Sequence, residues 1–122
     1  MDTRSKILID TAILDGKSLC VVTGYFDVLR AEHVRELAEA RRRTPECPLL
    51  VVVLQARDPL LPRAARAELV AALRMVDYVL TTDDKDVDAL IEALKPAVLV
   101  RLESEDVRRV SRLKEHVHRR QG

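Results

Sequence analysis

Residues 49–55 read LLVVVLQ, an unbroken apolar run with prolines before and after it. The run is too short for an ordinary helix, and its valines favour a β-strand. Because polar residues do not alternate with apolar ones along the run, we expect both faces of this strand to be buried. Strands of that kind are typical of parallel sheets that carry a layer of helices on each side. The run therefore predicts one strand of such a sheet.

The rest of the chain alternates between short apolar runs and longer amphipathic runs. Three further short runs predict strands, at residues 18–23, 78–80 and 97–101. Four amphipathic runs predict helices, at residues 29–43, 63–76 and 85–94 and from Ser104 onward. This order predicts an α/β fold in a single domain of residues 1–122, a Rossmann-like, doubly wound parallel sheet with helices on both faces. We expect the first strand to be central, which makes the turn at residues 23–24 the first place to look for chemistry.

The composition excludes several classes of protein. The 21 Lys and Arg residues nearly cancel the 20 Asp and Glu residues, so a generally basic nucleic-acid coat is excluded. With only Tyr25, Phe26 and Tyr78 as aromatic residues, the chain has no stacking platform for single strands, and we expect no nucleic-acid partner. No apolar stretch approaches 18 residues and no signal peptide is apparent, so we expect no membrane partner and a cytoplasmic location.

Familiar cofactor and metal motifs are missing. The sequence contains neither GxGxxG nor GxxxxGK[ST], and its three glycines are too few for a glycine-rich phosphate cradle. His116 and His118 stand two residues apart on a predicted helix and cannot face one metal ion. A cluster of aspartates is interpreted as the solvated start of a helix, at Asp83, Asp84, Asp86 and Asp88. We therefore expect no metal ligands.

Residues 23–37 read TGYFDVLRAEHVREL, which resembles the signature G-x-F-D-x-x-H-x-G-H of the cytidylyltransferase-like nucleotidyltransferases. Four residues fall on the signature at its own spacing: Gly24, Phe26, Asp27 and His33. Two later segments, RAELVAALRMVDYV at 66–79 and IEALKPAVLV at 91–100, resemble the ADP-heptose synthase and glycerol-3-phosphate cytidylyltransferase branch. The resemblance therefore covers nearly the whole chain in the right order.

The resemblance implies transfer of a nucleotidyl group from an NTP, either CTP or ATP with Mg²⁺, to a sugar or polyol phosphate. In the family the protein positions the phosphates and stabilises charge, and it forms no covalent intermediate. Carried onto this chain, the resemblance assigns catalytic roles to Arg30 and His33. It assigns nucleotide-binding roles to Gly24, Tyr25, Phe26, Asp27, Arg57 and Arg63. It also allows a homodimer.

Each of these residues has a structural alternative. Phe26 is suited to packing beneath the loop, and Asp27 to accepting backbone N–H bonds within it. His33 is either a phosphate donor or a residue of the helix surface. Further along, Arg74 and Asp77 resemble structural partners at the turn before the third strand.

The chain departs from the signature at two positions that matter to phosphates. Arg30 replaces the first histidine, and Glu32 replaces the glycine against which the nucleotide would pack. A carboxylate about 4 Å from a phosphate charge would repel it by roughly 4 kcal/mol at an effective dielectric constant of ~20. The family's later K-G-G-D is replaced by residues 101–104, RLES, and its final phosphate-binding motif is missing.

The sequence therefore leaves two interpretations open. One is an enzyme of the family in which catalysis is impaired or lost. The other is a non-catalytic module that binds a nucleotide or a protein on the same fold.

Overall fold

The computed structural model describes residues 2–27, 29–55 and 60–103. Its four strands are parallel and form one sheet in the order β3-β2-β1-β4. The strands are β1 (Cys20–Gly24), β2 (Leu49–Leu54), β3 (Tyr78–Thr82) and β4 (Val98–Arg101). The predicted α/β class and the central position of the first strand are confirmed. The helix predicted from Ser104 onward lies outside the described residues.

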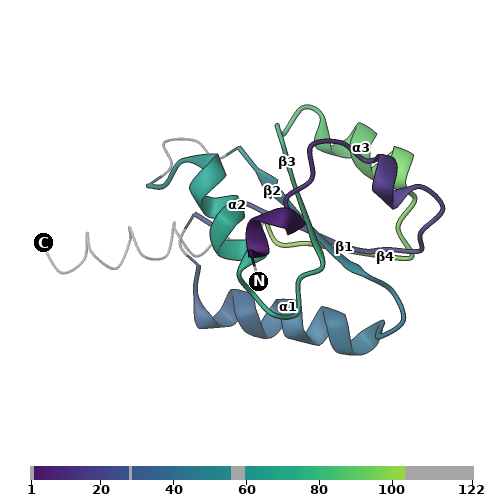
Figure 1. The fold of residues 1–122 in the computed structure, drawn as a ribbon, viewed down its shortest axis with the longest axis horizontal. Helices are drawn as coiled ribbons and strands as arrows, with labels where there is room; N and C mark the ends of the chain where they lie inside the picture. Colours follow the sequence, from purple (N-terminus) through teal and green to yellow (C-terminus); the bar gives the residue numbers. More distant parts are fainter. Residues whose placement is uncertain (1, 28, 56–59, 104–122) are drawn as a thin grey trace, which may run out of the picture.

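Helices cover both faces of the sheet. They are α1 (Ala31–Arg43), α2 (Arg63–Ala71) and α3 (Val87–Leu94), with short 3-10 turns η1 (Thr3–Lys6) and η2 (Ala12–Leu14) before β1. Leu37 of α1 and Val70 of α2 belong to one core cluster, whereas Val87 of α3 and Leu14 of η2 belong to the other. Figure 1 shows α1 and α3 on opposite sides of the sheet. Right-handed crossovers account for this arrangement, because the chain reverses its direction across the sheet after β3.

Strand β2 is the centre of the core, as its sequence predicts. All six of its residues are buried. Val51 and Val53 pack into the cluster beneath α1 and α2, while Leu50 and Val52 pack into the cluster beneath α3. Burying a side chain of this size stabilises the fold by about 1.5–3 kcal/mol.

The carboxyl ends of β1 and β4 form the switch point of the sheet. From β1 the chain proceeds through β2 to β3, and it then returns to place β4 on the other side of β1. The Leu102 N–H donates to the Thr23 carbonyl over 2.8 Å, so the pairing continues just past β4. In open α/β sheets, ligands bind outside the carboxyl ends of the strands at such a point.

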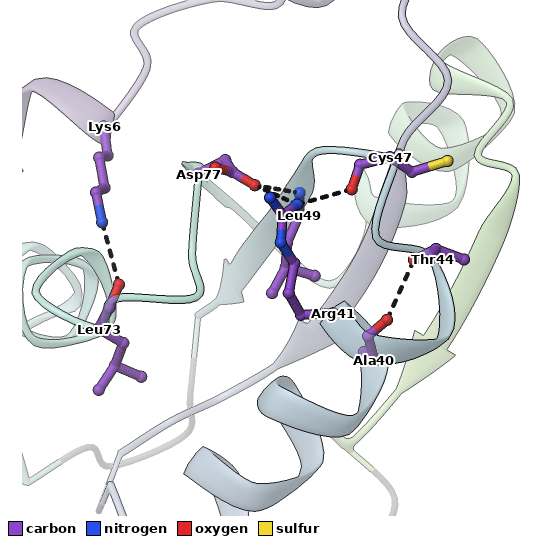
Figure 2. A network of polar contacts seen from close by, with 8 residues as sticks. All are labelled: Lys6, Ala40, Arg41, Thr44, Cys47, Leu49, Leu73 and Asp77. Atoms are coloured by element: carbon purple, nitrogen blue, oxygen red, sulfur yellow. Dashed lines mark hydrogen bonds and ion pairs between the residues drawn. The ribbon is translucent and has the colours of Figure 1, made fainter.

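The amino end of the sheet is closed by an ion pair that Figure 2 shows. Nη1 of Arg41, near the end of α1, lies 2.8 Å from Oδ2 of Asp77 and donates to the Cys47 carbonyl over 2.9 Å. The same Asp77 oxygen accepts the Leu49 N–H over 2.8 Å. The predicted pairing of Arg74 with Asp77 is therefore wrong. The aspartate instead joins α1 to the starts of two strands.

Candidate functional site

The start of α1 carries the two residues to which the signature gives catalytic roles. Arg30 is the N-cap of the helix, and its backbone N–H donates to Nδ1 of His33 over 3.1 Å. His33 thus takes the role that glutamate or glutamine has in a capping box. With Nδ1 accepting, the neutral imidazole carries its proton on Nε2. His33 is also only 3% exposed, so it does not belong to the helix surface. Its side chain instead helps to cap the start of the helix.

The turn after β1 is packed against its own aromatic ring. Phe26 has a φ of +52° and is 1% exposed. A Cβ atom on Gly24 would lie 2.9 Å from a carbon of that ring, so only glycine allows this close approach. The centroid of the Phe26 ring also lies 5.4 Å from that of His33. Phe26 therefore packs beneath the loop, and its contact with a nucleotide stays a prediction.

Asp27 joins this turn to the segment before α2. Its carboxylate accepts the Leu60 N–H over 2.9 and 3.0 Å and the Leu61 N–H over 3.1 Å. Asp27 accepts backbone N–H bonds as predicted, but the donors do not belong to its own loop. The sequence did not indicate that the donors lie more than thirty residues away, after β2.

Arg66 of α2 is buried in the same place. Its Nη1 donates to the carbonyls of Tyr25 and Leu54 over 2.6 and 2.7 Å, and its Nε donates to the Leu61 carbonyl over 3.2 Å. Its Nη2 is buried and has no hydrogen-bond partner within the described part of the chain. Burial lowers the pKa of Arg66, and the charge of Asp27 acts in the opposite direction. Sequence reasoning missed this residue, whose only signal was its place in the 66–79 segment.

The remaining predicted binding residues meet acidic partners. Nη1 of Arg63 lies 2.9 Å from Oδ1 of Asp83, and the Tyr25 hydroxyl donates to Oδ2 of Asp84 over 3.4 Å. The interpretation of the aspartate cluster as a solvated helix start is borne out at Asp84, Asp86 and Asp88, which are exposed before and within the first turn of α3, whereas Asp83 pairs with Arg63. Arg57 lies outside the described residues.

A carboxylate also lies at the switch point. The Thr23 hydroxyl donates to Oε2 of Glu103 over 2.7 Å, and the Glu103 side chain is only 18% exposed. Nη2 of Arg101 lies 2.9 Å from Oδ1 of Asp88, and its Nη1 lies 3.9 Å from Oε1 of Glu103. Sequence reasoning noted that RLES replaces the family's segment, but it did not predict the contact of Glu103 with β1.

Glu32 is exposed in the first turn of α1, where a negative charge stabilises the helix dipole. For an exposed carboxylate the solvent screens strongly, and the repulsion at 4 Å falls to about 1 kcal/mol. The larger repulsion expected from the sequence is thus corrected downward. Among the described residues, no group of three or more His, Cys, Asp or Glu side chains could hold a metal ion.

Curated relatives match the chain at moderate identity, whereas no protein-family model matches it. The FAD synthase of Methanoregula boonei is 37% identical over 83 residues, which are 65% of this chain and 56% of that protein. The bifunctional protein HldE of Geotalea uraniireducens is 40% identical over 96 residues, which are 70% of this chain and 19% of that protein. HldE of Geobacter metallireducens is 36% identical over a segment of the same length.

These relatives fit the cytidylyltransferase-like family, and the predicted resemblance to that family is confirmed at moderate identity. The chain spans about half the length of the FAD synthases and about a fifth of the HldE proteins. The crystal structure of a lipopolysaccharide core biosynthesis protein from Thermoplasma volcanium has the same fold, with a TM-score of 0.61 at 24% identity. That alignment covers 69% of this chain and 73% of the other. Within the described residues, no helix is long and apolar enough to cross a membrane.

Proposed function

We propose that this cytidylyltransferase-like chain is related to enzymes that transfer a nucleotidyl group from an NTP to a sugar or polyol phosphate, and that its own catalysis is impaired or lost. In the reaction, an oxygen of the acceptor phosphate forms a bond to the α-phosphorus, and the bond to the pyrophosphate oxygen breaks. Mg²⁺ bound with CTP or ATP would neutralise the outer phosphates. The protein's share is to donate hydrogen bonds and hold the phosphates in line.

The start of α1 is the observation that carries this proposal. The amino end of this helix is suited to an anion by its dipole and its N–H groups. Arg30 at the N-cap could bind a phosphate oxygen, but a guanidinium cannot give up a proton at neutral pH. His33 is buried, with Nδ1 engaged by the cap, and Glu32 adds a negative charge to the first turn. These features support a phosphate-facing helix end that is poorly equipped for turnover.

A second candidate is a non-catalytic module on the same fold. The charges around the carboxyl end of the sheet favour it. Asp83 pairs with Arg63, and Glu103 accepts from Thr23 at the switch point, so carboxylates occupy positions near which phosphates would have to lie. The partner of such a module would be a nucleotide or another protein. A homodimer and a cytoplasmic location remain predictions.

Thermal unfolding in the presence of CTP or ATP with Mg²⁺ tests the proposal. We expect little or no rise in Tm at millimolar nucleotide. Release of pyrophosphate by the purified chain in the presence of a sugar phosphate or polyol phosphate would contradict the loss of catalytic competence, and a rise of several degrees would contradict an obstructed nucleotide site. Binding without pyrophosphate release would favour the second candidate in its nucleotide-binding form.

A further inference from the structure

We propose that Arg66 and Asp27 are positioning residues, which together lock the motif-bearing segment after β1 to the segment that leads into α2. The inference rests on the proposed function, because the site that they would position is the phosphate-facing start of α1. Neither residue needs to touch the nucleotide for this role. Both act through backbone groups of other residues.

The first support comes from the hydrogen bonds that Arg66 donates. It reaches the carbonyls of three separate segments: Tyr25 just after β1, Leu54 at the end of β2 and Leu61 just before α2. A planar guanidinium with donors in a fixed fork can satisfy three acceptors at once. A lysine ammonium is a single point on a flexible stem and cannot hold the same geometry.

The second support is that Asp27 and Arg66 both bind the backbone of one residue, Leu61. Asp27 accepts the N–H of Leu61, and Arg66 donates to the carbonyl of that residue. Asp27 also accepts the N–H of Leu60. Leu61 therefore cannot shift along the chain direction without breaking a bond at one end or the other.

The third support is that simple packing does not account for Arg66. It is 0% exposed, and none of the described carboxylates lies within ion-pairing distance of it. Its Nη2 has no partner among the described residues. An apolar side chain of similar length would fill this space without burying a charge or a spare donor. The arginine is thus better explained by the backbone groups that it holds.

The consequence for the site is geometric. The segment held through Tyr25 and Asp27 runs directly into the N-cap Arg30, and the segment held through Leu61 runs directly into Arg63 at the start of α2. The hydrogen bonds of Arg66 form one clamp and those of Asp27 form a second. Together the two clamps fix the beginning of α1 relative to the beginning of α2. Misplacement of phosphate-binding groups by 1 Å is enough to reduce function by about a hundredfold in enzymes.

Three variants of the full chain separate the possible roles of Arg66. Arg66→Met keeps much of the side-chain length but removes the charge, and Arg66→Lys keeps the charge but removes the planar guanidinium. Asp27→Asn weakens the bonds to the N–H groups of Leu60 and Leu61. The matched control is Arg41→Lys, which changes an arginine that also donates to a carbonyl but lies at the amino end of the sheet. Amide hydrogen exchange is followed by NMR, and inorganic tripolyphosphate is titrated against the amides of residues 30–33.

All three site variants should speed exchange at Leu60 and Leu61 by at least about tenfold and weaken tripolyphosphate binding by about tenfold, while the control leaves both within about twofold. Wild-type binding by Arg66→Lys would show that charge suffices, and wild-type binding by Arg66→Met would show that packing suffices. Either result overturns the inference, as does unchanged exchange at Leu61 in the Arg66 variants. If the wild-type chain shows no shift with tripolyphosphate, the phosphate-facing start of α1 is refuted while the loss of catalysis stands, and exchange alone then decides whether the clamps exist.

Discussion

The two ends of the sheet each use an arginine to hold backbone groups, but they treat its charge in opposite ways. At the amino end, Arg41 is paired with Asp77 (Figure 2), and the side chains of both residues are 36–37% exposed. At the carboxyl end, Arg66 is fully buried, donates only to neutral carbonyls and retains a donor without a partner in the described chain. Arg41 therefore has a direct ion-pair partner that solvent screens, whereas the buried Arg66 has no ion-pair partner among the described residues and is affected by the charge of Asp27 from beyond ion-pairing distance.

This difference indicates that the fold loses some stability at the carboxyl end of the sheet, where a ligand would bind. An unsatisfied buried donor costs about 1–3 kcal/mol, so a brace that served stability alone would be better built like that of Arg41. Arg66 lies at the end of the sheet where doubly wound folds bind their ligands.

The largest expected loss of stability is that of Arg66→Met, which is compared with Arg41→Met. Arg66→Met leaves three carbonyls without this donor, of which that of Leu54 is buried and those of Tyr25 and Leu61 are partly buried, and it should lower the free energy of unfolding by about 3 kcal/mol. Arg41→Met acts on a half-exposed pair and should cost about 1 kcal/mol. Urea denaturation monitored by circular dichroism measures both. Equal losses for the two variants would remove the contrast between the ends.

Glycines near the two ends should also differ. Gly24→Ala places a Cβ atom 2.9 Å from the Phe26 ring and should cost about 2 kcal/mol through overpacking. Gly16, just before β1, has open space around it but a φ of +76°, and Gly16→Ala should cost about 1 kcal/mol through backbone strain alone. Adding Phe26→Leu should recover part of the loss for Gly24→Ala and none of it for Gly16→Ala. A double-mutant cycle with no coupling between positions 24 and 26 would contradict this packing account.

The smallest expected effect on stability is at the rim of the carboxyl end. Asp83→Asn breaks a partly exposed ion pair with Arg63 and should cost less than about 0.5 kcal/mol. Since Arg63 then lacks its counter-charge, tripolyphosphate binding should strengthen by about twofold to fivefold at low salt. This gain should disappear in 0.5 M NaCl, where charges at a surface are screened within about 4–5 Å. Isothermal titration at the two salt concentrations measures it, and a loss of affinity at low salt would show that Arg63 does not face the phosphates.

Much of the fold was predictable because burial on both faces leaves a plain mark in the sequence. The run around β2 specifies a covered parallel strand, and the other strands follow with shifts at their ends. Strand β3 extends to Thr82, past the apolar residues, because its pairing with β2 continues through polar threonines. Helix α2 ends at Ala71 rather than at residue 76, although Leu73 and Val76 still pack against the core. The apolar spacing shows which side chains are buried, and here it continues beyond the last residue of the helix.

The candidate site was predictable only in part, because the signature marks residues and not their partners. It located Gly24, Asp27 and His33 at the carboxyl end of β1, and the carboxylate of Asp27 accepts backbone N–H bonds as expected. Arg66 escaped prediction because an arginine on an amphipathic helix is ordinarily solvent-facing, and nothing in the spacing signals its complete burial. The contact of Thr23 with Glu103 joins residues eighty positions apart, which no local pattern could indicate.

The central claim is that the changes at the start of α1, rather than a loss of the fold, reduce nucleotide affinity. The most direct test is calorimetric titration of CTP and ATP, with Mg²⁺, into the wild-type chain and into the variant that combines Arg30→His with Glu32→Gly. Glu39→Gly, which removes another exposed glutamate from α1, is the control. We predict that the double variant binds about fivefold more tightly than the wild type, which corresponds to the repulsion of about 1 kcal/mol that it removes, and that the control binds as the wild type does. Equal binding by the wild type and the double variant would contradict the claim.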